Sequence, residues 1–122
     1  MLINNDIPFV NENLEMKKAL KILSNKKLGI LIVRNKKNIT KGIITDGQIR
    51  RFNEKKISIQ LLKVEEIMTK NPLSVSKDCL AAKALAIMNN KKITSLCVFD
   101  GKNKSKTIGV VHIHNILKNN IS

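Results

Sequence analysis

The stretch KGIITDGQIRRF, residues 41–52, decides the fold, because the chain carries a blurred counterpart in IGVVHIHNILKN, residues 108–119. Each stretch passes from a glycine through apolar residues typical of a strand to a polar corner, and then to residues with helical spacing. In the first stretch the corner is TDG, residues 45–47, and we expect a helix to begin near Gln48. A corner that occurs twice suggests that the whole chain is duplicated.

The chain of 122 residues contains an internal repeat. Residues 10–33 align with residues 75–98 at a shift of 65 positions and without a gap. After a turn that is two residues longer in the second copy, residues 42–44 align with residues 109–111. A constant register over about forty residues indicates duplication rather than chance. The matched pairs include Val10 and Val75, Lys18 and Lys83, Ala19 and Ala84, Leu20 and Leu85, Ile22 and Ile87, Leu31 and Leu96, Val33 and Val98, Thr45 and His112, and Gln48 and Asn115.

Each copy has the order β-α-β-β-α, which predicts an α/β fold made of two repeats packed as a pseudo-twofold pair. We place the repeats at residues 1–60 and 61–122. One repeat alone has a three-stranded sheet with helices on one side, so a second repeat is needed to cover the remaining apolar surface. The expected strands are residues 7–10, 29–33 and 42–45 in the first copy and residues 72–75, 95–99 and 107–111 in the second.

A helix is expected after the first strand of each copy. Its apolar stripe consists of Leu14, Met16, Ala19, Leu20 and Leu23 in the first copy, and of Leu80, Ala84, Leu85, Ile87 and Met88 in the second. The side chains that can cap these helices are Asn11 or Asn13 in the first copy and Ser76 or Asp78 in the second. A short helix closes each copy, at residues 48–52 and 115–119.

The formal net charge of +14 is typical of proteins that bind an anionic partner. The basic residues are spread along the chain, only three of them are arginines, and Trp and Tyr are absent, so nucleic-acid binding is disfavoured. The charge favours an anionic small molecule instead.

No apolar run approaches the ~20 residues of a membrane span, and no secretion signal is present, so we expect a cytoplasmic protein. Cys79 and Cys97 match no metal or redox spacing, and we expect both to be buried and inert.

The duplicated pattern, which ends each time in glycine, two apolar residues and a polar corner, resembles the cystathionine-β-synthase-type (CBS) domain pair over the whole chain. Four stretches narrow the resemblance: KKLG at 26–29, GIITDGQIRR at 42–51, EIMTKNP at 66–72 and GVVHIHNILK at 109–118. Together they resemble the carboxy-terminal CBS pair of arabinose-5-phosphate isomerases of the KpsF/GutQ type.

This resemblance implies a regulatory module that holds a nucleotide or a similar anion in the cleft between its two repeats. In the family a sugar isomerase (SIS) domain precedes the pair and makes arabinose 5-phosphate for Kdo, the acidic sugar of lipopolysaccharide. Met1 falls where the family's first CBS repeat begins, so we expect a cut-out regulatory module of a parent isomerase, without catalytic residues of its own. A homodimer formed through the CBS pairs is also expected.

The polar corner suits an anion, because the N–H groups and the aligned peptide dipoles at a helix amino terminus attract phosphate or carboxylate. We expect Gly47 to allow close approach and a positive φ, Thr45 to donate its hydroxyl, and Arg50 and Arg51 to add positive charge. The same residues also fit an ordinary turn and cap with a solvated arginine face. The expected ligand-binding residues are Thr45, Asp46, Gly47, Gln48, Arg50, Arg51, Thr94, Ser95, His112, His114 and Asn115.

Gln48 and Asn115 stand where, by the resemblance, adenosine-binding CBS pairs carry aspartate for the ribose hydroxyls. A neutral amide weakens that contact by ~1–3 kcal/mol, which disfavours AMP and ATP. The candidate regulatory ligand is therefore CMP-Kdo, sensed as feedback, or another anionic nucleotide. An oligomerisation module with an empty or degenerate cleft is the alternative. His112 and His114 share a face, but without an evident third ligand we expect no metal site.

Overall fold

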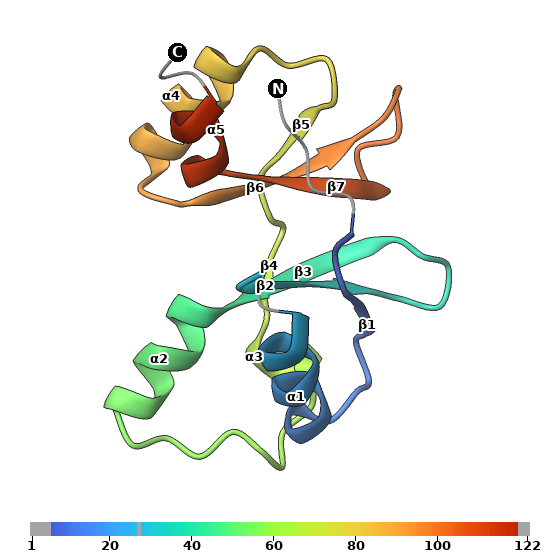
Figure 1. Ribbon diagram of the computed structural model, residues 1–122. Helices are drawn as coiled ribbons and strands as arrows, with labels where there is room; N and C mark the ends of the chain where they lie inside the picture. The colour runs from blue at the N-terminus through green and yellow to red at the C-terminus, as the bar shows by residue number, and fades with distance from the viewer. Residues whose placement is uncertain (1–5, 27, 120–122) are drawn as a thin grey trace. The chain divides into compact units, whose positions relative to one another are not determined.

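The structure, a computed structural model, describes the backbone of residues 6–26 and 28–119, and the side chains of these residues except 115, 118 and 119. The chain divides into two compact units (Figure 1). The first unit is Ile7–Pro72, and the second contains Leu73 and the residues after it together with Asp6. The segment 61–72, which precedes the second set of strands, therefore lies with the first unit.

The first unit is a four-stranded sheet with its helices on one face (Figure 1). The strand order is β1-β2-β3-β4, with β1 parallel to β2 and the other neighbours antiparallel. Met16, Ala19 and Leu23 form the buried stripe of α1 and pack in one core with residues of β2 and β3. The elements are β1 (Phe9–Asn11), α1 (Met16–Lys26), β2 (Ile30–Arg34), β3 (Thr40–Thr45), α2 (Asp46–Glu54), α3 (Val64–Ile67) and β4 (Thr69–Lys70).

The second unit repeats this plan with a three-stranded sheet in the order β5-β6-β7, again with the helices on one face (Figure 1). Its core includes Ala84 and Met88 of α4, packed with Leu96 and Val98 of β6. The elements are β5 (Ser74–Ser76), α4 (Ala81–Lys91), β6 (Ser95–Phe99), β7 (Thr107–His112) and α5 (Ile113–Asn119). The predicted α/β fold of two β-α-β-β-α repeats is confirmed.

The duplication extends to the register of the strands. Phe9 is opposite Ile32 between β1 and β2, and Ser74 is opposite Cys97 between β5 and β6, which are the same positions shifted by 65. Both hairpins carry an irregularity at the equivalent place, between residues 33 and 34 and between residues 98 and 99. The central strands β2 and β6 are buried along nearly their whole length, as expected for their continuous apolar runs.

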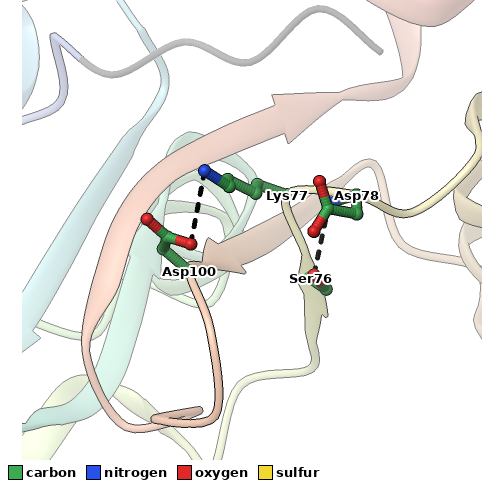
Figure 2. Close-up of polar contacts among 4 residues, drawn as sticks. All are labelled: Ser76, Lys77, Asp78 and Asp100. Atoms are coloured by element: carbon green, nitrogen blue, oxygen red, sulfur yellow. Dashed lines mark hydrogen bonds and ion pairs between the residues drawn. The ribbon is translucent and has the colours of Figure 1, made fainter.

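The predicted caps of the first helix in each copy are wrong. Asn11 Oδ1 accepts the N–H of Asn13 at 2.9 Å, and Ser76 Oγ accepts the N–H of Asp78 at 3.2 Å. These bonds close turns between strand and helix, because short polar side chains readily bond the backbone two residues ahead. Both helices begin later, at Met16 and Ala81. Figure 2 shows the turn at Ser76 beside an exposed ion pair, Lys77 Nζ to Asp100 Oδ1 at 3.4 Å.

Three further expectations need correction. The last helix of the first copy begins at Asp46 and not near Gln48, because Thr45 already acts as its N-cap. The first sheet has a fourth strand, since β4 adds Thr69 and Lys70 to the free edge of β3. Leu80 does not belong to the apolar stripe of α4: it stands at the N-cap position and its side chain is 75% exposed.

Candidate functional site

The corner between β3 and α2 contains the amino terminus of α2, which the hydroxyl group of Thr45 caps. Thr45 has extended backbone angles, φ −121° and ψ 156°, and its Oγ1 accepts the N–H of Gln48 at 3.3 Å. The N–H of Asp46 donates to the carbonyl of Gly29 at 3.0 Å. Among the residues that the structure describes, the N–H of Gly47 has no hydrogen-bond partner. This N–H is the donor that an anion can reach, and the helix dipole adds positive potential there.

Gly47 lies inside α2 and does not have a positive φ, so the chain does not use the tolerance of positive φ that glycine offers there. A Cβ at Gly47 would meet only Arg51 Nη1, at 3.7 Å. The guanidinium of Arg51 therefore lies beside the first turn of the helix, one turn from its own Cα. Arg50 is exposed on the same helix. Glycine is not required by the chain at this position, but it leaves the space in front of the helix end free.

Asp46 faces the turn that precedes β2. Its Oδ2 lies 3.0 Å from the position where a Cβ would stand on Gly29, which has φ +74°. The carboxylate is exposed and interacts favourably with the dipole of α2. Its negative charge lies at the same helix end as the guanidinium of Arg51 and would oppose an anion placed there. Sequence reasoning did not include Gly29 in the site, although the motif KKLG, residues 26–29, was a signal for it.

Gln48 is tied to a neighbouring element. Its Nε2 donates to the carbonyl of Ile67 at the end of α3, and its Oε1 is buried without a partner among the described residues. The side chain therefore connects α2 to α3 and uses its only donor group for that purpose. The Nε2 group keeps a second N–H, whereas the Oε1 acceptor is buried and is not exposed to a ligand.

The second corner, between β7 and α5, has the same backbone bonds and a different cap. The N–H of Ile113 donates to the carbonyl of Thr94 at 2.8 Å, as Asp46 does to Gly29. Ser95 is paired with His112 across the sheet. His112 Nδ1 accepts the N–H of His114 at 3.2 Å, so an imidazole takes the place of the hydroxyl. Asn115 lies in α5, but its side chain is outside the described part of the structure.

The two imidazoles stack with ring centroids 4.9 Å apart and planes inclined by 27°. Burial lowers the pKa of His112 below its usual value of 6.5, and the nearby His114 lowers it further. A neutral His112 is the form that can accept a hydrogen bond at Nδ1. The hydrogen bond by which His112 caps α5 therefore depends on the protonation state of its ring.

The structure thus brings the predicted residues together as two separate groups, one at each corner. Thr45, Asp46, Gly47, Gln48, Arg50 and Arg51 belong to the first unit, and Thr94, Ser95, His112 and His114 belong to the second. Three surface hollows of the first unit, of about 410, 480 and 500 Å³, lie elsewhere and include none of these corner residues in their linings.

Among the described residues, the cysteine side chains and the possible metal ligands show no sign of a reactive site. Burial raises the pKa of the Cys97 thiol to about 11, although a hydrogen bond with Thr107 acts in the opposite direction, so the sulfur stays protonated near neutral pH. Cys79 is only half-buried, which differs from the prediction. Within residues 6–26 and 28–119 there is no cluster of three or more His, Cys, Asp or Glu side chains placed to hold a metal ion. No helix in the same residues is long and apolar enough to cross a membrane.

Comparison with known proteins agrees with the duplicated fold. The sequence model of the CBS domain matches twice, at residues 2–55 and 64–121. A structure described as a signal-transduction protein with CBS domains, from Burkholderia ambifaria MC40-6, is 28% identical, with a TM-score of 0.84, and covers 97% of this chain and 85% of that one. The CBS domain pair of MJ0100, in complex with 5′-methylthioadenosine and S-adenosyl-L-methionine, is 21% identical, with a TM-score of 0.82, and covers 95% of this chain and 89% of that one.

Among curated proteins, the arabinose 5-phosphate isomerase KdsD of Yersinia pestis is 34% identical over 113 residues, which is 93% of this chain and 34% of the isomerase. The chain spans about a third of the length of the curated relatives that it matches. The narrower resemblance to arabinose-5-phosphate isomerases is thereby confirmed as a sequence relationship. With both repeats matched by the family model, the chain belongs to the CBS-domain family.

Proposed function

We propose that this chain is the regulatory CBS pair of an arabinose 5-phosphate isomerase in the pathway to Kdo and lipopolysaccharide. It binds an anionic nucleotide or nucleotide sugar, and CMP-Kdo is the leading candidate. The similarity to KdsD supports the choice of enzyme. The parent then contains a sugar isomerase domain, acts in the cytoplasm and forms homodimers through its CBS pairs.

The complex of the MJ0100 pair with two nucleoside ligands supports a nucleotide as the class of molecule, since that pair has the same fold. The net charge of +14 favours the more anionic members of this class by long-range attraction. Among the described residues no hydrogen bond is formed between a serine or cysteine side chain and a histidine ring, and the proposal assigns regulation and not chemistry to this part of the protein.

One observation carries the proposal, namely the free N–H of Gly47 with Arg51 beside it. Two positive features converge there, the helix amino terminus and a guanidinium that can form a forked contact with a carboxylate or phosphate. A hydroxyl cap at Thr45 leaves that N–H available, because it binds the N–H of Gln48 instead.

The neutral side chain of Gln48 bears on which nucleotide is bound. A carboxylate at this position would hold ribose hydroxyls, but it would also repel an anionic group at the same corner. Here the amide is engaged with Ile67, so it adds no negative charge and offers no strong grip on a ribose. With an amide instead of a carboxylate at position 48, the affinity for an acidic sugar nucleotide is therefore reduced less than the affinity for AMP.

Calorimetric titration with CMP-Kdo, CMP, AMP and ATP tests the proposal. We expect CMP-Kdo to bind most tightly and Arg51→Gln to weaken it by roughly ten- to a hundredfold, the loss of one charge-assisted contact. Lys37→Gln is the matched control, because it removes one exposed positive charge from a turn far along the chain from the corner. Absence of heat with all four ligands, together with a stable ligand-free dimer by light scattering, would support the oligomerisation alternative.

A further inference from the structure

The sequence contains two Asp-Gly pairs, Asp46–Gly47 and Asp100–Gly101, and the structure places them in different surroundings. At such a pair a polypeptide can react with itself, because the backbone nitrogen that follows the aspartate can attack the side-chain carboxyl group. Glycine favours this attack, since it has no Cβ to hinder the approach and allows wide rotation of the backbone. Whether the reaction occurs depends on the freedom of the backbone at each pair.

Asp46–Gly47 is held in a helix. Both residues belong to the first turn of α2, which Thr45 caps, and the N–H of Asp46 donates to the carbonyl of Gly29 at 3.0 Å. The nitrogen of Gly47 can reach the carboxyl group of Asp46 only if the backbone leaves its helical angles. The first turn of α2 therefore has to open before the two groups can react.

Asp100–Gly101 lies in the turn between β6 and β7, outside the helices and strands. Both residues are exposed, and the side chain of Asp100 is 54% exposed. Gly101 has φ +70°, and a Cβ on it would meet no described atom within 4 Å. The N–H of Gly101 forms no hydrogen bond with a described residue. The backbone of this pair can therefore rotate without breaking a helix or a strand pairing.

The corresponding turn of the first unit is closed by hydrogen bonds. A shift of 65 positions places Asn35 on Asp100. Asn35 Oδ1 accepts the N–H of Lys37 at 2.9 Å and that of Ile39 at 3.1 Å. Asp100 instead forms the ion pair with Lys77 shown in Figure 2, at 3.4 Å. Solvent screens such an exposed pair, so it restrains the carboxylate only weakly.

We propose that Asp100–Gly101 is a site of spontaneous isomerisation to isoaspartate, and that the helix protects Asp46–Gly47. The nitrogen of Gly101 forms a bond to Cγ of Asp100, and the carboxyl hydroxyl leaves with the amide proton as water, which gives a succinimide ring. Water then adds to the ring. Where it cleaves the bond between the nitrogen and the original main-chain carbonyl carbon, the main chain afterwards runs through Cβ and Cγ, which is isoaspartate.

The product changes the turn but not the net charge of the chain. One methylene group enters the main chain between β6 and β7, and the free carboxylate stands on the α-carbon of residue 100. The carboxylate that pairs with Lys77 is thereby displaced. This inference concerns the second unit alone and does not depend on the identity of the ligand.

Incubation of the chain at neutral pH, followed by tryptic digestion, tests the proposal. Trypsin cuts after Lys and Arg, so residues 42–50 and 93–102 are released as separate peptides with one Asp-Gly pair each. Chromatography separates the isoaspartyl form of each peptide from its aspartyl form, and fragmentation mass spectrometry identifies it. We expect at least about tenfold more isoaspartate at residue 100 than at residue 46, because the helical turn has to open first. Similar amounts at the two residues, or an excess at residue 46, would overturn the proposal.

Incubation in concentrated urea is the control for the role of the fold. The unfolded chain has no helix at Asp46, so the two pairs should then isomerise at similar rates. A difference as large as in the folded chain would contradict protection by α2.

Two variants test the chemistry at the turn. Asp100→Glu keeps a carboxylate but would need a larger ring, so it should abolish isomerisation in the peptide 93–102 and leave the peptide 42–50 unchanged. Gly101→Asn introduces a residue that tolerates a positive φ and adds a Cβ, so it should slow isomerisation at Asp100 severalfold. An unchanged rate in Gly101→Asn would contradict attack by the nitrogen of residue 101.

Discussion

In the first unit a threonine hydroxyl caps the helix after the sheet hairpin, whereas in the second unit a histidine imidazole does so. The hydroxyl of Thr45 binds the N–H of the third helical residue and leaves that of the second, Gly47, free. The imidazole of His112 binds the N–H of the second helical residue, His114, and closes the place that is open in the first unit. Duplication has therefore kept the backbone of the corner and changed which N–H group of the helix its cap satisfies.

The start of α1 is bonded to the connector, since the N–H of Met16 donates to Leu62, whereas no described residue outside α4 accepts the N–H of Ala81. Equivalent positions in a duplicated fold thus differ most where polar groups at helix ends are satisfied. The apolar interiors share most of their buried positions, although Ile59, Val64 and Ile67 are described for the first core alone. The shared interior packs each unit, and the bonds at the helix ends distinguish the two.

The largest effect is expected from the paired core leucines. Leu31 and Leu96 occupy equivalent positions and are 0% and 1% exposed. Truncation of either to alanine removes buried methyl groups and leaves a cavity, so each should lower the free energy of unfolding by about 2–5 kcal/mol. Urea denaturation measures the change, with Leu61→Ala, at a side chain 90% exposed, as control. A large loss for one leucine and none for the other would show that the cores are not equivalent.

The next largest effect concerns β4, which among the described residues has no counterpart in the second sheet. A Cβ on Gly42 would lie 2.6 Å from the carbonyl oxygen of Thr69 and 2.7 Å from Met68 Sδ. Gly42→Ala should therefore destabilise the first unit by about 1–3 kcal/mol and weaken the pairing of β3 with β4.

Gly47→Ala is the matched control for that change. Its Cβ has room and its backbone is helical, so it should stabilise the chain by about 0.5–1 kcal/mol while it obstructs the free N–H of the corner. Thermal unfolding and nucleotide titration of the same variant give opposite signs if the corner binds the ligand. A Gly42→Ala protein as stable as wild type would remove β4 from the account.

The caps predict a pH dependence for the second unit only. The pKa of His112 is lower in the folded chain than in the unfolded chain, because the cap and burial disfavour the imidazolium. As the pH falls, the unfolded chain takes up the proton first. The contribution of His112 to stability is therefore complete above about pH 6.5 and is lost as the pH falls through the lowered pKa.

Melting temperatures between pH 8 and pH 5 test this dependence. Asparagine can cap a helix without titrating in this range, so His112→Asn should flatten the acid side of the profile. Thr45→Asn at the corresponding residue of the first unit should leave it unchanged. An unaltered profile for His112→Asn would show that the acid sensitivity does not come from the His112 cap.

The smallest effect is expected from the exposed ion pair of Figure 2. Lys77 and Asp100 have side chains 46% and 54% exposed, and solvent screens their attraction. Lys77→Ala should change the free energy of unfolding by less than about 0.5 kcal/mol, as surface pairs usually do. A loss comparable to that of Leu96→Ala would mean that the β5 turn depends on charge and not on its backbone bonds.

The fold could be predicted from the sequence because duplicated residues such as Val33 and Val98 reveal the register of whole elements. The hydrogen bonds at the helix ends could not be predicted from the sequence. Asn11 and Ser76 each have two possible uses, as a cap or as a turn, and only the path of the chain decides between them. The bond from Gln48 to Ile67 spans 19 positions and leaves no local signal. β4 is two residues long, which is too short for any periodicity.

The central claim is that the corner of the first unit receives an anion at the free N–H of Gly47. Backbone amide chemical shifts, followed during titration with CMP-Kdo, test it residue by residue. We expect the amide of Gly47 to shift strongly and saturably, together with the guanidinium of Arg51, while the amide of Ala82, in the first turn of α4, does not move. A saturating titration that leaves Gly47 and Arg51 unshifted would contradict the claim.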